Sequence, residues 1–413
     1  MNTTTARRAE RPAAPAPASA PAPAANPTAR SPSQPGQAGW RDRWWDRWFR
    51  WRDRRLRDPQ FQRWAVGFFL TRPIAQRRAQ GLFDLMAGFV YTQVLLACVR
   101  LRLFDLLADA PLQADVIAQR LQLPLDATLR LLDAAVALRL LELRGAGRYG
   151  VGSLGAPLVG NAALAAMTEH HATLYRDLTD PVALLRQGAQ GSELGHYYAY
   201  AGATRPDQLT TDRVQAYSQL MAASQPLVAQ EVLDAYRFDR HRVLLDVGGG
   251  DGAFLTAVAP RAPQLSLRLF DLPAVAELAR ARFAANGLAA RTDCVGGDFF
   301  NDPLPAGADL ISLVRVAFDH PDEQVLRLLR NVRRALPPGG VVLLAEPMSD
   351  VPGVEAMGDA YFGMYLLAMG RGRPRSAQQL AELLHQAGFD PVDALPTRMP
   401  LQAGLLLARA ASA

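Results

Sequence analysis

The second half of the chain alternates short apolar runs with longer stretches in which apolar residues recur every three or four positions. Five such runs, each bounded by Gly, Pro or Asp, lie at residues 243–250, 267–273, 292–300, 308–316 and 340–348. Short apolar runs separated by helical stretches indicate parallel strands that are buried on both faces. We therefore predict an α/β domain over residues 241–413, with helices on both faces of a parallel sheet and GLLLARA (404–410) as a last, edge strand.

Residues 81–160 carry a local, helical pattern: three short helices followed by a glycine-flanked hairpin. This order predicts a winged helix, a fold that often binds DNA. The third helix, however, offers only Arg130 and Arg139 among leucine and alanine. A helix this apolar is expected to be buried, so we predict no nucleic-acid partner and keep a DNA-binding regulator as the alternative. Residues 161–240 look helical, with a histidine and aromatic patch in HHATLYRDL and GHYYAYAG.

The N-terminal part divides into two segments of unlike composition. Residues 1–39 are mostly Ala, Pro, Ser and Thr, which predicts disorder because they bury too little surface to offset ordering. Residues 40–80 are rich in Trp and Arg and predict two short helices, separated near Pro59 and stopped near Pro73.

A tryptophan stripe marks the first of these two helices. On a helix, Trp40, Trp44, Trp48 and Trp51 share one face and arginines cover the others, a pattern typical of a helix in a membrane interface. The alternative is that the stripe packs on the protein itself or on a dimer partner, and four interspersed aspartates weaken the membrane interpretation. We expect peripheral membrane contact through residues 40–64.

The apolar stretch at residues 82–99 is the strongest candidate for a membrane span. Asp84, Thr92 and Gln93 interrupt it, and it falls short of the roughly 20 apolar residues that a span needs. We therefore predict a core or dimer-interface helix. Its composition leaves both of these roles open.

Composition adds two constraints. The formal charge is +6, and all 45 basic residues are arginine, so a single arginine carries little weight as a signal. The two cysteines, Cys98 and Cys294, lie far apart without metal-type spacing. We expect reduced thiols, no metal and a cytoplasmic protein, with possible attachment to the inner (intracytoplasmic) membrane.

The candidate chemistry gathers at the ends of three successive predicted strands. The first strand holds Asp246 and runs into a glycine turn with Gly248 and Gly250, whose spacing differs from the dinucleotide motif G-x-G-x-x-G. Asp271 ends the second strand, where a carboxylate can accept both hydroxyls of a ribose. Asp298 and Phe299 end the third, suited to an exocyclic amine and an aromatic base. The alternative is that these aspartates merely end strands or cap helices.

Four segments together carry a family resemblance: LDVGGGDG, FDLP, GGDFF and LVRVAFDHPDEQVLRLLRNVRRALPPGGVVLLAEP. Over about residues 80–410 the chain resembles S-adenosylmethionine-dependent O-methyltransferases of the acetylserotonin and caffeic-acid type. The resemblance implies a C-terminal Rossmann-like class I methyltransferase domain, an N-terminal winged-helix dimerisation domain, a homodimer and S-adenosyl-L-methionine as cofactor. Residues 40–100 further resemble bacterial carotenoid O-methyltransferases, which implies the tertiary hydroxyl of an acyclic carotenoid as acceptor. A small aromatic or polyketide hydroxyl is the alternative.

The resemblance also assigns residues to the cofactor. It implies that Asp246, Gly248 and Gly250 form the glycine-turn contact, that Asp271 and Leu272 lie at the ribose, and that Asp298 and Phe299 hold the adenine. Arg315 falls in the strand that closes the pocket beside the methionine end. Together, the residues implied to bind the cofactor are Asp246, Gly248, Gly250, Asp271, Leu272, Asp298, Phe299 and Arg315.

The chain departs from the family pattern at the catalytic base. Members with phenolic acceptors have histidine where this chain has Phe318, and the second acid that orients it falls at about Pro374. Glu346 matches the first of those acids. His320 is the nearest candidate base, with Asp319 beside it, although His320 is as well explained as a packing or capping residue. An aromatic and methionine set is implied to line the acceptor pocket, or else to be core: His171, Tyr175, Phe318, Tyr361, Tyr365 and Met369.

Overall fold

The computed structural model describes residues 40–198, 224–400 and 402–411. The chain divides into two compact units, residues 1–88 and 89–413. The Ala/Pro segment predicted to be disordered, residues 1–39, lies outside the described residues. So do residues 199–223, which include the end of the GHYYAYAG patch.

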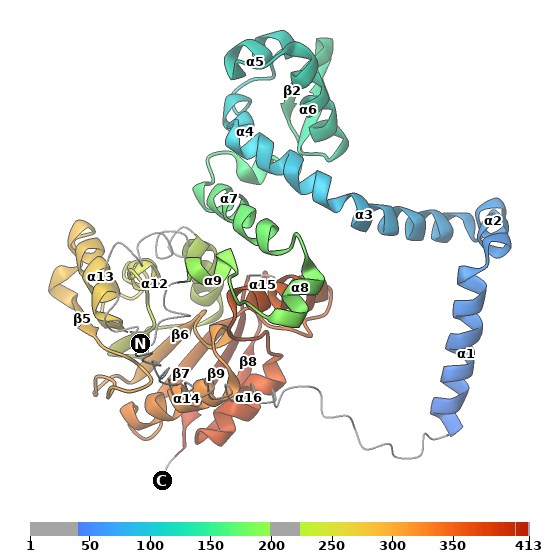
Figure 1. Ribbon diagram of the computed structural model, residues 1–413. Helices are drawn as coiled ribbons and strands as arrows, with labels where there is room; N and C mark the ends of the chain where they lie inside the picture. Colours follow the sequence, from blue (N-terminus) through green and yellow to red (C-terminus); the bar gives the residue numbers. More distant parts are fainter. Residues whose placement is uncertain (1–39, 199–223, 401, 412–413) are drawn as a thin grey trace, which may run out of the picture. The chain divides into compact units, whose positions relative to one another are not determined.

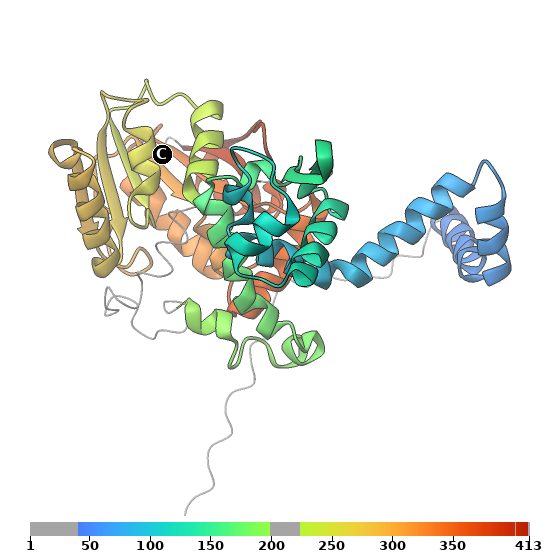
Figure 2. The same ribbon diagram turned by 90° about the horizontal axis from the view of Figure 1, so that it is seen from above.

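The first unit is a succession of helices with a bend at each junction (Figures 1 and 2). Helix α1 spans Trp40–Arg57, and α2 spans Pro59–Gly67. Asp58 separates them because its carboxylate caps α2, accepting from the backbone N–H of Gln60 at 2.9 Å. The predicted break near Pro59 is therefore confirmed. The predicted stop at Pro73 is wrong, because Pro73 lies in the first turn of α3 (Arg72–Arg100), where its missing N–H has no helical partner to lose.

Helix α3 is longer than the apolar pattern predicted. Its 29 residues have the length and composition of a membrane-crossing helix, and only 11% of its most apolar window is buried. Asp84 does not end it, because its carboxylate accepts from Gln80 one turn earlier at 2.8 Å, and Thr92 donates to the carbonyl of Phe89 at 3.1 Å. The prediction that this stretch is too short to span a membrane is therefore wrong, because the helix that contains it is long enough. Dimer-interface helices share the same composition.

The second unit begins at Phe89, within α3, and contains three short helices followed by the predicted hairpin. The first predicted helix, VYTQVLLACVRLRLFDLL, is divided between the end of α3 and a short helix after it. The helices are α4 (Leu103–Leu106), α5 (Ala114–Leu121) and α6 (Leu125–Ala137), and the hairpin pairs β1 (Leu141–Arg144) with β2 (Arg148–Val151). They share one apolar core, to which α6 contributes Leu132 and Ala135. The apolar face of the third helix is therefore buried, as predicted. The core includes Leu103, Phe104, Ile117, Leu132, Ala135 and Leu141.

A seven-stranded sheet follows within the described residues, in the order β5-β4-β3-β6-β7-β9-β8 (Figure 1). The first five strands of this order are parallel, as predicted, and β9 runs antiparallel to both of its neighbours, β7 and β8. The order reverses on either side of β3, so the carboxyl ends of β3 and β6 flank a crevice position typical of ligand sites. The strands are β3 (Val243–Val247), β4 (Ser266–Asp271), β5 (Thr292–Gly296), β6 (Leu310–Val314), β7 (Val341–Glu346), β8 (Phe389–Leu395) and β9 (Gly404–Ala410).

The C-terminal strand differs from its predicted place. GLLLARA forms β9, which lies between β7 and β8 and is not an edge strand. Its side chains are mostly buried, which suits an inner position, whereas β8 exposes most of its residues and contains Pro391, which has no N–H for a further partner. The edge is therefore β8.

Helices cover both faces of the sheet (Figures 1 and 2). One face packs on α14 (Asp322–Ala335) and α16 (Ala377–Gln386). The other packs on α12 (Ala253–Val258), α13 (Pro273–Ala285) and the helical residues 224–235. Both layers are apolar, so the sheet is rigid where its strands end.

Four further helices share an aromatic cluster outside the sheet. They are α7 (Ala162–Asp177), α8 (Pro181–Gln187), α9 (Glu193–Tyr197) and α15 (Phe362–Met369). Their buried side chains include Leu174, Leu194, Tyr198, Tyr365 and Met369, and Phe318 packs against them.

Candidate active site

The glycine turn after β3 has no room for a side chain at Gly248. Gly248 has φ of +70°, and a Cβ at this position would lie 2.8 Å from Cγ2 of Val316. The same Cβ would lie 3.6 Å from Cε1 of Phe299. The turn therefore brings its bare backbone next to Val316 and Phe299, which lie on two different strand ends.

Asp246 lies beneath this turn. Its Oδ1 accepts from the hydroxyl of Ser312 at 2.6 Å, while its buried Oδ2 has no hydrogen-bond partner among the described residues. Burial raises the pKa of Asp246 to about 7, and the nearby charge of Asp271 adds to the rise against the opposing effect of Ser312. An orphaned buried carboxylate oxygen fits a site that receives a polar or cationic ligand group.

Asp271 at the end of β4 is oriented by two backbone groups. Its Oδ2 accepts from the N–H of Gly250 at 2.8 Å, and its Oδ1 accepts from the N–H of Leu272 at 2.7 Å. Burial raises its pKa to about 6, although both hydrogen bonds oppose this. The structure therefore brings Asp271, Gly250 and Leu272 together at one edge of the sheet.

The loop after β5 is fixed from two sides. The carboxylate of Asp298 accepts from the N–H of Phe300 at 2.8 Å and from the amide of Asn301 at 2.6 Å. Asn331 on α14 donates its amide to the carbonyl of Phe299 at 2.8 Å. These bonds hold the ring of Phe299 beside Gly248.

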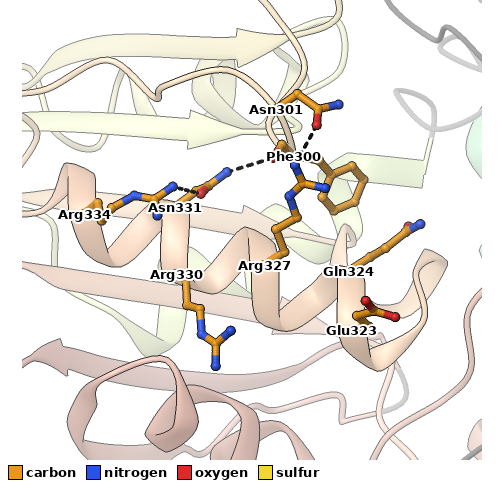
Figure 3. Close-up of a pocket in the computed structure, with 8 residues that line it drawn as sticks. All are labelled: Phe300, Asn301, Glu323, Gln324, Arg327, Arg330, Asn331 and Arg334. Atoms are coloured by element: carbon orange, nitrogen blue, oxygen red, sulfur yellow. Dashed lines mark hydrogen bonds between the residues drawn. The ribbon is translucent and has the colours of Figure 1, made fainter.

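A surface hollow of about 650 Å³ lies behind this loop, along α14 (Figure 3). Arg327 crosses it to donate to Asn301 at 2.7 Å. The hollow is polar and differs in character from the aromatic cluster around α15. It is lined by Phe300, Asn301, Glu323, Gln324, Arg327, Arg330, Asn331 and Arg334.

Arg315 follows β6 with a backbone conformation that is uncommon for a residue with a side chain, φ of +58°. Such strain is found most often at functional sites. Its guanidinium donates to Ser224 Oγ at 2.8 Å and to Gln225 Oε1 at 2.6 Å. Arg315 thereby ties the end of β6 to the helical residues 224–235.

The turn that follows, residues 316–320, is held by its backbone. Glu346 is fully buried, and its Oε1 accepts from the N–H of Val316 at 2.9 Å and of Ala317 at 2.6 Å. Arg375 donates to the carbonyl of Ala317 at 2.9 Å and of His320 at 2.6 Å. Glu346 therefore binds the donors of the turn, and Arg375 binds its acceptors.

The two aromatic residues of this turn point to different surroundings. His320 is buried, and its ring centroid lies 4.9 Å from that of Phe300 and 5.8 Å from that of Phe299. Burial, with the charge of Arg371 next in effect, lowers the pKa of His320 to about 4. Phe318 instead packs on the aromatic cluster, 6.0 Å from the ring of Phe362.

The aromatic cluster contains two histidine and tyrosine pairs. His170 Nε2 lies 2.8 Å from the hydroxyl of Tyr365, and His171 Nε2 lies 2.8 Å from that of Tyr361. Met369 is buried in the same cluster. Tyr175 differs from the other predicted lining residues, because its hydroxyl contacts Thr92 on α3.

Several residues that hold the site carry no sequence signal. Arg375 stands in an arginine-rich loop of a chain whose basic residues are all arginine, so nothing distinguishes it. Asn331 and Ser312 are polar positions in a helix and a strand. Their partners, Phe299 and Asp246, are known only once the fold is assembled.

This fold and site define a class I methyltransferase architecture with an attached helical domain. Residues 175–390 match the model of the O-methyltransferase domain, and residues 83–166 match that of the O-methyltransferase dimerisation domain. The chain belongs to the O-methyltransferase family.

Individual relatives agree with the family models. The chain is 43% identical to demethylspheroidene O-methyltransferase of Cereibacter sphaeroides, over 84% of this chain and 92% of that protein. It is 40% identical to demethylspheroidene O-methyltransferase of Rhodobacter capsulatus, over 80% and 82% respectively. Among solved structures, human N-acetylserotonin methyltransferase in complex with SAM matches 81% of this chain and 98% of that one, with a TM-score of 0.67 at 26% identity.

Proposed function

We propose that this protein transfers a methyl group from S-adenosyl-L-methionine to the tertiary 1-hydroxyl of an acyclic carotenoid, and that it acts as a homodimer. The observation that carries the proposal is the environment of Phe318, which stands where family members with phenolic acceptors have histidine. Phe318 packs on the aromatic cluster around α15, and we call this side of residues 316–320 the acceptor side. Such a wall suits a polyene. The similarity to two demethylspheroidene O-methyltransferases supports this acceptor, and the dimerisation domain supports the homodimer.

The residues at the glycine turn fit S-adenosyl-L-methionine. Asp271 offers a carboxylate to a ribose, and Phe299 offers a ring face to an adenine beside the bare backbone of Gly248. The orphaned Oδ2 of Asp246 offers an acceptor to a cationic group. Arg315 would close the methionine end. The bound cofactor supplies a methyl group activated by a sulfonium.

The protein's own contribution to such a reaction is positioning. Rate gains in a direct displacement come from aligned reactants and excluded water. Glu346 and Arg375 fix the turn that separates the glycine turn from the aromatic cluster. Phe318 on that turn excludes water from the acceptor side. A tertiary alcohol is too weak an acid to ionise first, so any base takes its proton as the new bond forms.

The test uses the full chain with labelled S-adenosyl-L-methionine. A 1-hydroxy acyclic carotenoid should gain the label and 14 mass units, which is one methylene. Turnover of a phenol or polyketide, with none of the carotenoid, would contradict the proposed acceptor while leaving the family assignment intact.

We also propose that residues 40–64 attach this enzyme to the cytoplasmic face of the membrane that dissolves its acceptor. Tryptophan prefers headgroup depth, and arginine is attracted to anionic lipid. The indole side chains of α1 are exposed: Trp40 is 74% exposed and Trp51 57%. The ring centroids of Trp44 and Trp45 lie 5.0 Å apart and those of Trp45 and Trp48 lie 5.9 Å apart, so these three indoles form one aromatic surface.

A further inference from the structure

The acceptor side offers two histidine and tyrosine pairs that differ in accessibility. His170 and Tyr365 are both buried, so this pair is part of the packed cluster. His171 and Tyr361 are each only partly buried, while their hydrogen bond has the same length, 2.8 Å. Of the two pairs, the second is therefore the more accessible to a bound acceptor.

Tyr361 lies close to the position of the missing base. Its ring centroid is 4.9 Å from that of Phe362, which in turn is 6.0 Å from Phe318. Phe318 follows Val316, the residue that walls the glycine turn. The ring of Tyr361 therefore packs in the same cluster as Phe318, whereas His320 packs on Phe299 and Phe300.

The backbone at Tyr361 is also unusual. Residues Ala356–Tyr361 form a π-helix that leads directly into α15. This widened turn is rare and is found most often at functional sites. It ends at Tyr361, so it sets where this side chain leaves the helix.

Protonation states suit a proton relay. Burial raises the pKa of Tyr361, which keeps the phenol neutral. Burial lowers the pKa of His171, so its imidazole is neutral at neutral pH and Nε2 can accept the phenolic proton. His320 is enclosed by Phe299 and Phe300 on the other side of the turn.

We propose that Tyr361 takes the proton of the acceptor hydroxyl as it passes its own proton to His171, and that this pair replaces the family's base histidine. The inference rests on the proposed function. The acceptor oxygen bonds to the methyl carbon while the carbon–sulfur bond breaks, and that electron pair stays on sulfur. The hydroxyl proton moves to Tyr361, the phenolic proton moves to His171 Nε2, and the resulting imidazolium later releases a proton to water.

Two variants and a matched control test this pair. Tyr361→Phe and His171→Gln should each lower kcat about 100-fold, the range for a general base, with little change in KM or in S-adenosyl-L-methionine affinity. The control is Tyr236→Phe, which removes the hydroxyl of another tyrosine that bonds a histidine. The Tyr236 hydroxyl lies 2.6 Å from His241 Nε2, and Tyr236 packs against the layer that contains α12 and α13. It should keep wild-type turnover.

The outcomes separate the two proposals. A raised KM at unchanged kcat in Tyr361→Phe, unchanged turnover, or an equal loss in Tyr236→Phe would overturn the relay. A wild-type protein that methylates no carotenoid would instead overturn the proposed acceptor.

Histidine NMR gives a readout without turnover, since the chain has only six histidines. Tyr361→Phe should move the Nε2 resonance of His171, and Tyr236→Phe that of His241. An unmoved His171 resonance would show that the pair does not form and would also overturn the relay.

Discussion

Glu346 accepts a hydrogen bond of 2.6 Å from the backbone N–H of Ala317. The resemblance to the family implies that this acid orients a base histidine, but here Phe318 stands at that position and the same carboxyl group holds the backbone instead. Its Oε1 also accepts from Val316 at 2.9 Å, as the carbonyl oxygen of a neutral acid can. Four experiments follow from this turn and its surroundings, and a fifth from α1.

Removing this acceptor should destabilise the protein. In Glu346→Ala the buried N–H groups of Val316 and Ala317 lose their partner, which costs about 1–3 kcal/mol of unfolding free energy. Glu346→Gln keeps an oxygen at Oε1 and should lose less. Chemical denaturation measures both, and Glu142→Ala on the exposed part of the hairpin is the control, expected to stay within about 0.5 kcal/mol. Equal losses in all three variants would contradict the assignment.

Glu346 should also make stability depend on pH. Burial raises its pKa from 4.5 to about 8, so between these values the folded protein holds a proton that the unfolded chain has released. The contribution of Glu346 to the unfolding free energy should therefore fall as pH rises from about 4.5 to about 8, whereas the lowered pKa values of the buried His170 and His320 act in the opposite direction below about 6.5. Glu346→Gln should flatten that slope relative to wild type. The pKa values of Asp246 and Asp271 are also raised, so these two residues keep part of the slope in both proteins. Parallel slopes would count against the raised pKa.

Arg375 should contribute more to stability than its neighbour Arg373. Both bind Asp322, but the side chain of Arg375 is 1% exposed and that of Arg373 is 26% exposed. Arg375→Ala leaves the buried carbonyls of residues 317 and 320 without their donor, for a loss of about 1–3 kcal/mol for each unsatisfied group. Arg373→Ala should cost at most about 1 kcal/mol. Denaturant midpoints compare the two directly, and a reversed order would refute the argument.

Asp271→Ala should weaken S-adenosyl-L-methionine binding, because it removes the carboxylate that we propose accepts from the ribose and releases the N–H groups of Gly250 and Leu272. Losing a charged acceptor costs about 1.5–3 kcal/mol, which is roughly a 10- to 100-fold rise in Kd. Calorimetry measures this. Asp293→Asn, on the neighbouring strand and exposed, should bind as wild type does. Equal affinity in Asp271→Ala would exclude the ribose contact.

The tryptophan stripe should govern membrane attachment. Replacing Trp44, Trp48 and Trp51 together by alanine, or deleting residues 1–58, should reduce sedimentation with vesicles of anionic lipid and spare cofactor binding. The triple substitution keeps every arginine, so it separates aromatic insertion from charge attraction. If it sediments as wild type does, α1 is better explained as a packing helix.

The five parallel strands and β9 were predictable because each is a short apolar run between turn residues, and the three acids followed from the ends of those runs. The sequence did not predict β8, whose FDPVDAL is interrupted by aspartates and a proline and is mostly exposed. The place of β9 in the strand order was not predictable, because an apolar sequence indicates that a strand is buried but not which strands it pairs with. The partners of Asp246, Phe299 and Ala317 lie tens of residues away. Contacts of this kind depend on the assembled sheet.

The environment of His320 shows the same limit. Its spacing from the strand suggested a base, since it is the histidine nearest to the family position. Whether a side chain two residues further along a turn points to the same side depends on the path of that turn, and here Phe318 and His320 face different neighbours. Its role as a base stays a prediction.

The hydrogen bonds that Glu346 and Arg375 form with residues 316–320 also bear on how the residue at the family's base position can change. Both form hydrogen bonds to the main chain of the turn, which do not depend on the side chain at position 318. Evolution could therefore exchange histidine for phenylalanine there without rebuilding the scaffold. The same property makes this position a convenient one for redesign toward other acceptors.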